Sequence, residues 1–171
     1  MTIRVAVVGY GYWGSKHARV LTSTPGVIVT IVDTDRARLA QARSAFPAAA
    51  LEARLSDALP LVDAVVVATP PRTHAPLAHE VLAAGRHVLV EKPLATSAAA
   101  CQSLIDRADH TGAVLMVGHT FEYNAAVRKL GEIVGEGELG DICYIAAARL
   151  NLGLYQRDVN VIWDLAPHDI S

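Results

Sequence analysis

The amino-acid sequence predicts an α/β fold: a doubly wound parallel sheet, followed by the beginning of a second α/β domain. Three observations lead to this prediction. Short apolar segments rich in Val and Ile, each long enough for one buried strand, recur through the first two-thirds of the chain. Helix-forming segments alternate with them, which is typical of a parallel sheet. Residues that suit ligand binding follow four of these strands, at the edge where open parallel sheets bind ligands.

The elements of the first part follow each other regularly. A strand is expected over residues 3–8 and a helix over 15–21, and a second strand over 27–32 precedes a helix over 35–43. This second helix consists of good helix formers and begins with an acidic residue, which suits the helix dipole. The remaining elements are expected to be a helical turn over 56–59, a strand over 63–68, a helix over 73–84, a strand over 87–90, a helix over 97–110 and a strand over 113–117. Gly85 and Gly112 end the last two helices.

The pattern changes after residue 118. A longer helix is predicted over 121–134, a glycine-rich turn over 135–140 and a long strand over 142–150, while 151–171 has no strong period. We therefore expect a dinucleotide-binding domain over 1–118 and the incomplete beginning of a substrate domain over 119–171. An apolar strand over 142–150 without sheet neighbours would tend to pair with another chain, so we expect either self-association through this strand or disorder beyond about residue 150.

Glycines follow the first strand at the G-x-G-x-x-G spacing, as Gly9, Gly11 and Gly14. In a strand–turn–helix context, this motif lets the backbone approach a pyrophosphate at the N-terminus of the helix. A P-loop is excluded, because Ser15 and Lys16 stand in the wrong order for it. Methyltransferases carry similar loops and stay open as an alternative. Asp33, 19 residues after Gly14, is near the spacing of an acid that binds the ribose hydroxyls, which favours NAD over NADP.

A second candidate site is the tripeptide Glu91-Lys92-Pro93 at the end of the strand expected over 87–90. Neighbouring side chains on a strand point to opposite sides, so Glu91 and Lys92 have different roles. One can address the ribose while the other reaches the reacting centre. The alternative is a solvated charge pair before a turn.

These motifs together resemble the glucose–fructose oxidoreductase / inositol dehydrogenase / MocA family. The resemblance rests on Gly9-Tyr-Gly-Tyr-Trp-Gly14, Asp33, Ala68-Thr-Pro-Pro-Arg-Thr-His74 and Glu91-Lys92-Pro93-Leu94. It implies a Rossmann domain followed by a substrate domain, and hydride transfer between NAD(P) and a secondary alcohol of a sugar, polyol or nucleotide sugar. The cofactor-binding residues that it implies are Gly9, Gly11, Tyr12, Trp13, Gly14, Asp33, Thr69, Pro70, His74, Glu91 and Lys92. The family's Lys lies between nicotinamide and substrate, and its Pro is often cis.

A later segment, Trp163 to Asp169, resembles the family's Asp-x-x-x-His motif. Asp164 and His168 map onto its catalytic pair, beside Lys92. If the segment is helical, residues at i and i+4 share a face, so the aspartate could orient the imidazole as a general base. The sequence departs from the family at 118–124 and at 157–163, and these two departures leave the substrate class open. A third departure is that the sequence ends at Ser171, just after the motif. A dinucleotide-binding fragment or sensor without catalysis is the alternative function.

Composition narrows the possible partners. The net charge is −2 and the basic residues are scattered, so we expect no nucleic-acid or membrane partner. No apolar run reaches transmembrane length, and a cytoplasmic location is expected. Cys101 and Cys143 lack metal-ligand spacing, so no metal is expected. The expected partners are a small-molecule sugar or polyol and further copies of the chain in a homo-oligomer.

Overall fold

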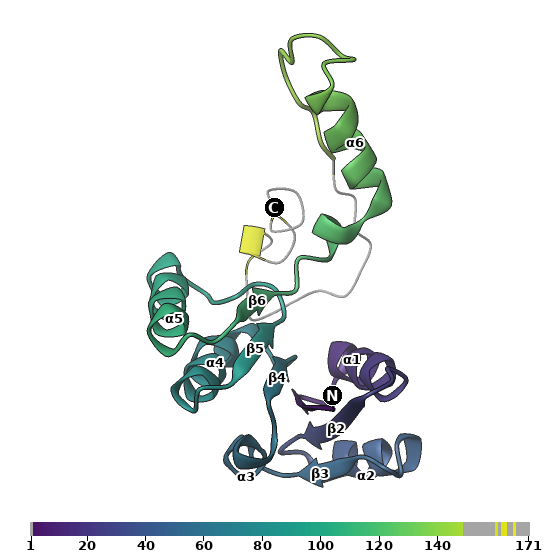
Figure 1. Cartoon of the computed structure of the whole chain (residues 1–171), viewed down its shortest axis with the longest axis vertical. Helices are drawn as coiled ribbons and strands as arrows, with labels where there is room; N and C mark the ends of the chain where they lie inside the picture. The colour runs from purple at the N-terminus through teal and green to yellow at the C-terminus, as the bar shows by residue number, and fades with distance from the viewer. Residues whose placement is uncertain (1, 149–159, 161, 164–165, 167–171) are drawn as a thin grey trace. The chain divides into compact units, whose positions relative to one another are not determined.

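The computed structural model describes residues 2–148, 160, 162–163 and 166. The chain divides into two compact units, Met1–Val117 and Gly118–Ser171, which are described separately. The helices and strands are labelled in Figure 1. No helix within the described ranges is both long and apolar enough to cross a membrane.

The first unit contains a six-stranded sheet in which every strand pair is parallel. Its strands are β1 (Ile3–Val8), β2 (Val27–Val32), β3 (Ala50–Glu52), β4 (Ala64–Val67), β5 (His87–Val90) and β6 (Leu115–Val117). They lie in the order β3-β2-β1-β4-β5-β6. This order reverses between β1 and β4, which is where the Rossmann fold binds dinucleotides. The predicted α/β, doubly wound parallel fold is confirmed.

Helices cover both faces of this sheet. They are α1 (Tyr12–Thr22), α2 (Arg36–Ala45), α3 (Leu55–Ala58), α4 (His74–Ala83) and α5 (Ala98–Thr111), with 3₁₀ turns η1 (Leu59–Leu61) and η2 (Pro71–Thr73). Alternate side chains of β1 belong to two hydrophobic cores, one on each face of the sheet. Val5 and Val7 pack with residues of α1 and α2, while Ala6 and Val8 pack with residues of α3, α4 and α5. Strands buried on both faces explain the continuous apolar runs in the sequence.

The second unit begins with the 3₁₀ turn η3 (Thr120–Tyr123) and the helix α6 (Ala125–Gly135). The side chain of Asn124 caps α6 by accepting the backbone N–H of Ala126 at 2.9 Å. Val127, Leu130 and Val134 recur at helical spacing, and 40%, 57% and 45% of their surfaces are exposed. Among the described residues of this unit, the helix therefore presents an exposed apolar stripe.

Several expected boundaries change in the structure. Helix α1 starts at Tyr12 rather than residue 15, because Gly11 is its N-cap and Gly14 lies inside the first turns. The three-residue strand β3 was not expected, since Ala50 and Glu52 are poor strand formers and only pairing with β2 defines it. The strand predicted over 142–150 is wrong for the described part, because 142–148 carries no strand. A strand needs a partner for its ladder, and none of the described sheet pairings reaches this segment.

Candidate functional site

The glycine turn after β1 is tightly packed, and two of its glycines are needed for that packing. Gly9 has a φ of +89°, and a Cβ atom there would meet the Ala68 carbonyl oxygen at 2.7 Å and Thr69 Cγ2 at 2.8 Å. A Cβ atom on Gly14 would overlap the carbonyl oxygen of Gly9. Glycine at both positions lets the turn, the start of α1 and the end of β4 lie in direct contact.

Gly11, in contrast, lies beside open space. A Cβ atom on Gly11 would meet nothing closer than Arg38 Nη1 at 4.0 Å. Gly11 is the N-cap of α1 and no side chain caps it, so the first backbone N–H groups of the helix are available to a ligand. An open helix N-terminus of this kind forms a cradle that can bind a phosphate group.

The rings of Tyr12 and Trp13 are exposed at the start of α1, with 64% and 46% of their surfaces accessible. They form an edge-to-face pair with ring centroids 5.3 Å apart, and the Lys16 ammonium lies 4.4 Å from the Tyr12 centroid. The pair thus lines the surface beside the glycine turn. Its contact with a cofactor stays a prediction.

Asp33, at the end of β2, is buried and firmly oriented. One carboxylate oxygen accepts the Tyr10 N–H at 2.7 Å and the other accepts the Asp35 N–H at 2.8 Å. Arg38 Nη1 lies 3.6 Å away and is half exposed. A carboxylate has about four lone-pair sites, so the two backbone hydrogen bonds do not exhaust its capacity to accept.

The segment after β4 is held by its own polar groups. The Thr73 hydroxyl lies 2.7 Å from both the Thr69 hydroxyl and the Pro70 carbonyl. Pro70 is exposed, whereas only 1% of His74 is. The His74 ring nitrogens lie 2.7 Å from the carbonyl oxygens of Thr69 and Pro93. The ring therefore connects the segments that follow β4 and β5.

Glu91 directly follows β5, and 8% of it is exposed. Its Oε1 lies 2.7 Å from Nε2 of His17, which belongs to α1. Lys92 is half-buried, and the Lys92–Pro93 peptide bond is cis, as the resemblance implied. Sequence reasoning missed His17. The available signal was its position three residues after Gly14, on the same face of the helix.

Backbone hydrogen bonds bring these strand ends together. Gly9 N–H donates to Val32 at 2.8 Å, Ala68 N–H donates to Val8 at 2.9 Å, and Glu91 N–H donates to Val67 at 2.9 Å. The glycine turn, Asp33, Thr69 and Glu91-Lys92 thus follow neighbouring strands at one edge of the sheet. Asp164 and His168 lie outside the described residues.

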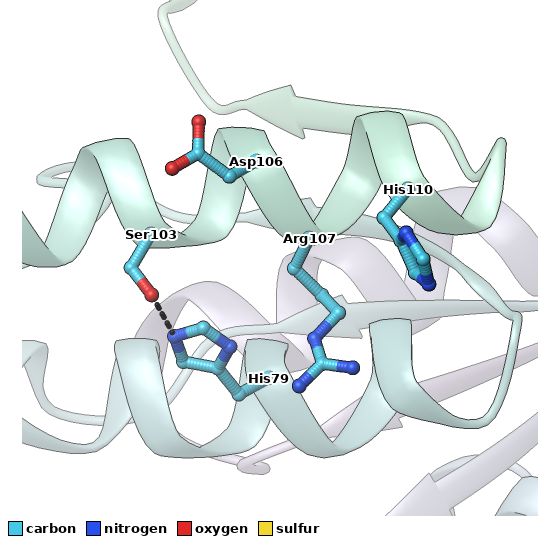
Figure 2. A pocket seen from close by; sticks show the side chains of 5 residues that line it. All are labelled: His79, Ser103, Asp106, Arg107 and His110. Carbon is cyan, nitrogen blue, oxygen red and sulfur yellow. Dashed lines mark hydrogen bonds between the residues drawn. The ribbon is translucent and has the colours of Figure 1, made fainter.

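A shallow groove of about 330 Å³ lies elsewhere, on the outer surface of α4 and α5 (Figure 2). It is lined by His79, Ser103, Asp106, Arg107 and His110. The Ser103 hydroxyl lies 3.3 Å from His79 Nε2. None of the residues predicted for the site lines this groove, and no cluster suited to a metal ion occurs in the part of the chain that the structure describes.

The geometry at the sheet edge agrees with a comparison against protein families. Residues 3–119 match the model of the Gfo/Idh/MocA oxidoreductase family, described as having an NAD-binding Rossmann fold. The chain belongs to this family. The Gfo/Idh/MocA match covers the whole sheet of the first unit, and it identifies NAD as the cofactor of this fold.

Similar proteins include dehydrogenases with different substrates. The 4-carboxy-2-hydroxymuconate-6-semialdehyde dehydrogenase of Sphingobium sp. is 36% identical over 140 residues, which are 80% of this chain and 44% of that protein. Inositol 2-dehydrogenase 2 of Saccharopolyspora erythraea is 30% identical, over 100% of this chain and 52% of that protein. The chain thus spans about half the length of the curated relatives that it matches.

The similar solved structures include complexes with the cofactor. GenD2 from gentamicin A biosynthesis, in complex with NAD, is 40% identical with a TM-score of 0.75 and matches 80% of this chain and 40% of GenD2. The WlbA dehydrogenase from Bordetella pertussis, in complex with NADH and UDP-GlcNAcA, is 31% identical with a TM-score of 0.76 and matches 81% of this chain and 41% of WlbA.

Proposed function

We propose that this chain provides the NAD-binding part of a dehydrogenase that transfers hydride between NAD and a secondary alcohol of a sugar, polyol or nucleotide sugar. The observation that carries the proposal is the meeting of three features at one sheet edge. These are the open cradle beside Gly11, the oriented carboxylate of Asp33, and Glu91-Lys92 after β5. NAD supplies the hydride acceptor when it is bound.

Each feature suits a different part of the dinucleotide. The N-terminus of α1 and the backbone at Gly11 bind the pyrophosphate, and Asp33 accepts hydrogen bonds from the adenine ribose. The Asp33 carboxylate also repels a 2′-phosphate, which favours NAD over NADP. Glu91, held by His17, addresses the nicotinamide end, and Lys92 beside it polarises the substrate or relays a proton.

The residues assigned to proton transfer follow from the family resemblance. In this proposal His168 accepts the proton of the substrate hydroxyl, and Asp164 orients its imidazole. The relatives support a sugar, polyol or nucleotide sugar substrate, because they include an inositol dehydrogenase and a structure with UDP-GlcNAcA.

Thermal unfolding with NAD, NADP and S-adenosylmethionine tests the binding step. A ligand at 100 times its Kd raises the free energy of unfolding by about 2.7 kcal/mol, so NAD should raise Tm clearly. Stabilisation by S-adenosylmethionine instead of NAD would refute the proposal.

NADH absorbance with a panel of polyols, sugars and nucleotide sugars tests the chemistry. In a complete enzyme that contains this chain, Lys92→Ala should keep NAD binding while reducing kcat by about 10²-fold or more. NAD binding without turnover of any substrate in the panel would favour the alternative of a dinucleotide-binding chain without catalysis.

A further inference from the structure

His74 is the most completely buried polar side chain at the sheet edge, with 1% of its surface exposed. It begins α4, and its ring lies between two backbone segments. Nδ1 lies 2.7 Å from the carbonyl oxygen of Pro93, and Nε2 lies 2.7 Å from the carbonyl oxygen of Thr69. Both distances are short for hydrogen bonds from nitrogen to oxygen.

These two contacts define the protonation state of the ring. A carbonyl oxygen only accepts hydrogen bonds, so each contact requires a proton on the imidazole nitrogen. A neutral imidazole has one N–H, and its other nitrogen would face a carbonyl lone pair with no proton between them. We infer that His74 is an imidazolium in the folded protein and acts as a positioning residue that clamps the segments after β4 and β5 together.

The burial of this charge is compatible with its surroundings. An unpaired buried charge is costly, but each ring nitrogen of an imidazolium at His74 would donate to a carbonyl oxygen 2.7 Å away. Hydrogen bonds from a charged donor are shorter and about twice as strong as neutral ones, which agrees with the two contacts of 2.7 Å.

The clamp acts on segments that contribute to the proposed NAD site. Thr69 lies against the glycine turn, where its Cγ2 limits the space at Gly9. Pro93 directly follows Lys92. By holding both carbonyls, His74 fixes Lys92 relative to the glycine turn. Because only 1% of its surface is exposed, we assign it this positioning role in place of the direct cofactor contact that the resemblance implied. This functional role rests on the proposed function, whereas the protonation state does not.

Nitrogen-15 NMR of the 171-residue chain, labelled at histidine, tests the protonation state directly. At neutral pH, both ring nitrogens of His74 should carry slowly exchanging protons that correlate with the ring carbons. The signals are assigned by scalar coupling from the backbone, so no variant has to fold. His79→Gln, a half-buried residue that lines the groove between α4 and α5, should leave them unchanged. One unprotonated nitrogen in His74 would overturn the inference.

His74→Gln tests the clamp. Amide hydrogen exchange over 69–73 and 91–95 should be faster by about tenfold or more, as expected for the loss of one charge-assisted hydrogen bond. The Kd for NAD should rise in parallel, while His79→Gln changes neither. Unchanged exchange in a folded His74→Gln protein would overturn the positioning role. If the parent chain does not bind NAD, the proposed function fails, yet the NMR and exchange results still decide the clamp.

Discussion

Gly14→Ala tests the packing that places α1 against the glycine turn. The added methyl group would overlap the carbonyl oxygen of Gly9, which is a backbone atom and not the end of a flexible side chain. Carbon and oxygen atoms approach each other to about 3.3 Å, so the helix and the turn must separate by about 1 Å or more. Overpacking typically costs about 1–3 kcal/mol and occasionally more.

The helix itself gains from the same substitution, because alanine is preferred over glycine inside a helix by about 1 kcal/mol. We take an overpacking cost at the upper end of its range and expect a net loss of about 2 kcal/mol. For a domain of this size, that loss lowers Tm by about 8 °C. The displaced helix N-terminus should also weaken NAD binding.

Two other glycines serve as matched controls. Gly11 has φ −89° and ψ −154°, which alanine can adopt, and its Cβ would meet only open space. Gly11→Ala should therefore change the free energy of unfolding by less than about 1 kcal/mol, but raise the Kd for NAD about tenfold or more by filling the cradle. Gly131 in α6 has no atom within 4 Å of an added Cβ, so Gly131→Ala should stabilise its helix.

Thermal unfolding and NAD calorimetry on the three variants distinguish these effects. The expected pattern is lost stability for Gly14→Ala, lost binding alone for Gly11→Ala, and neither loss for Gly131→Ala. A Gly14→Ala protein as stable as the parent chain would refute the packing argument. A Gly11→Ala protein with unchanged NAD affinity would show that no phosphate group approaches this turn.

Three further predictions follow from other contacts. The chain should bind NAD about tenfold or more tightly than NADP, because the Asp33 carboxylate repels a 2′-phosphate. Asp33→Asn should bring the two Kd values closer together. Equal Kd values for NAD and NADP in the parent chain would contradict the role of Asp33 at the ribose. The hydrogen bonds from Arg4 lower the pKa of Asp63 from 3.8 to about 2. The stabilisation by this pair should therefore be complete above pH 3.8 and lost as the pH falls through about 2. The free energies of unfolding of the parent chain and of Arg4→Met, measured with denaturant, should converge over that interval. A difference that stays constant with pH would contradict the role of this pair. The hydroxyl of Ser97 caps α5 by accepting the N–H of Ala100 at 3.2 Å. Ser97→Ala should therefore lower the free energy of unfolding by about 1 kcal/mol, as measured by thermal unfolding. Alanine in place of an exposed serine within a helix should not cause this loss.

Much of the first unit could be predicted because its signals are local. Apolar runs of strand length marked β1, β2, β4 and β5, and the strand over residues 87–90 has the bounds that the sequence predicts. The helix expected over 97–110 is present as α5, and the hydroxyl of Ser97 caps its N-terminus. The spacing of the three glycines indicated a dinucleotide site, because it encodes a turn, a close approach and a helix contact within six residues.

Long-range pairing explains what the sequence did not reveal. Strand β3 exists through its ladder with β2, and residues 142–148 form no strand although their composition favours one. The His17–Glu91 contact joins residues 74 positions apart, and His74 meets a carbonyl 19 positions away. Such contacts have no period or spacing in the sequence, since they arise only when the parallel sheet aligns its strand ends. The sequence alone therefore determined the fold class and the strand ends that carry the proposed site residues. Only the tertiary structure decided how histidines hold those residues in place, because each ring bridges segments that the sheet brings together.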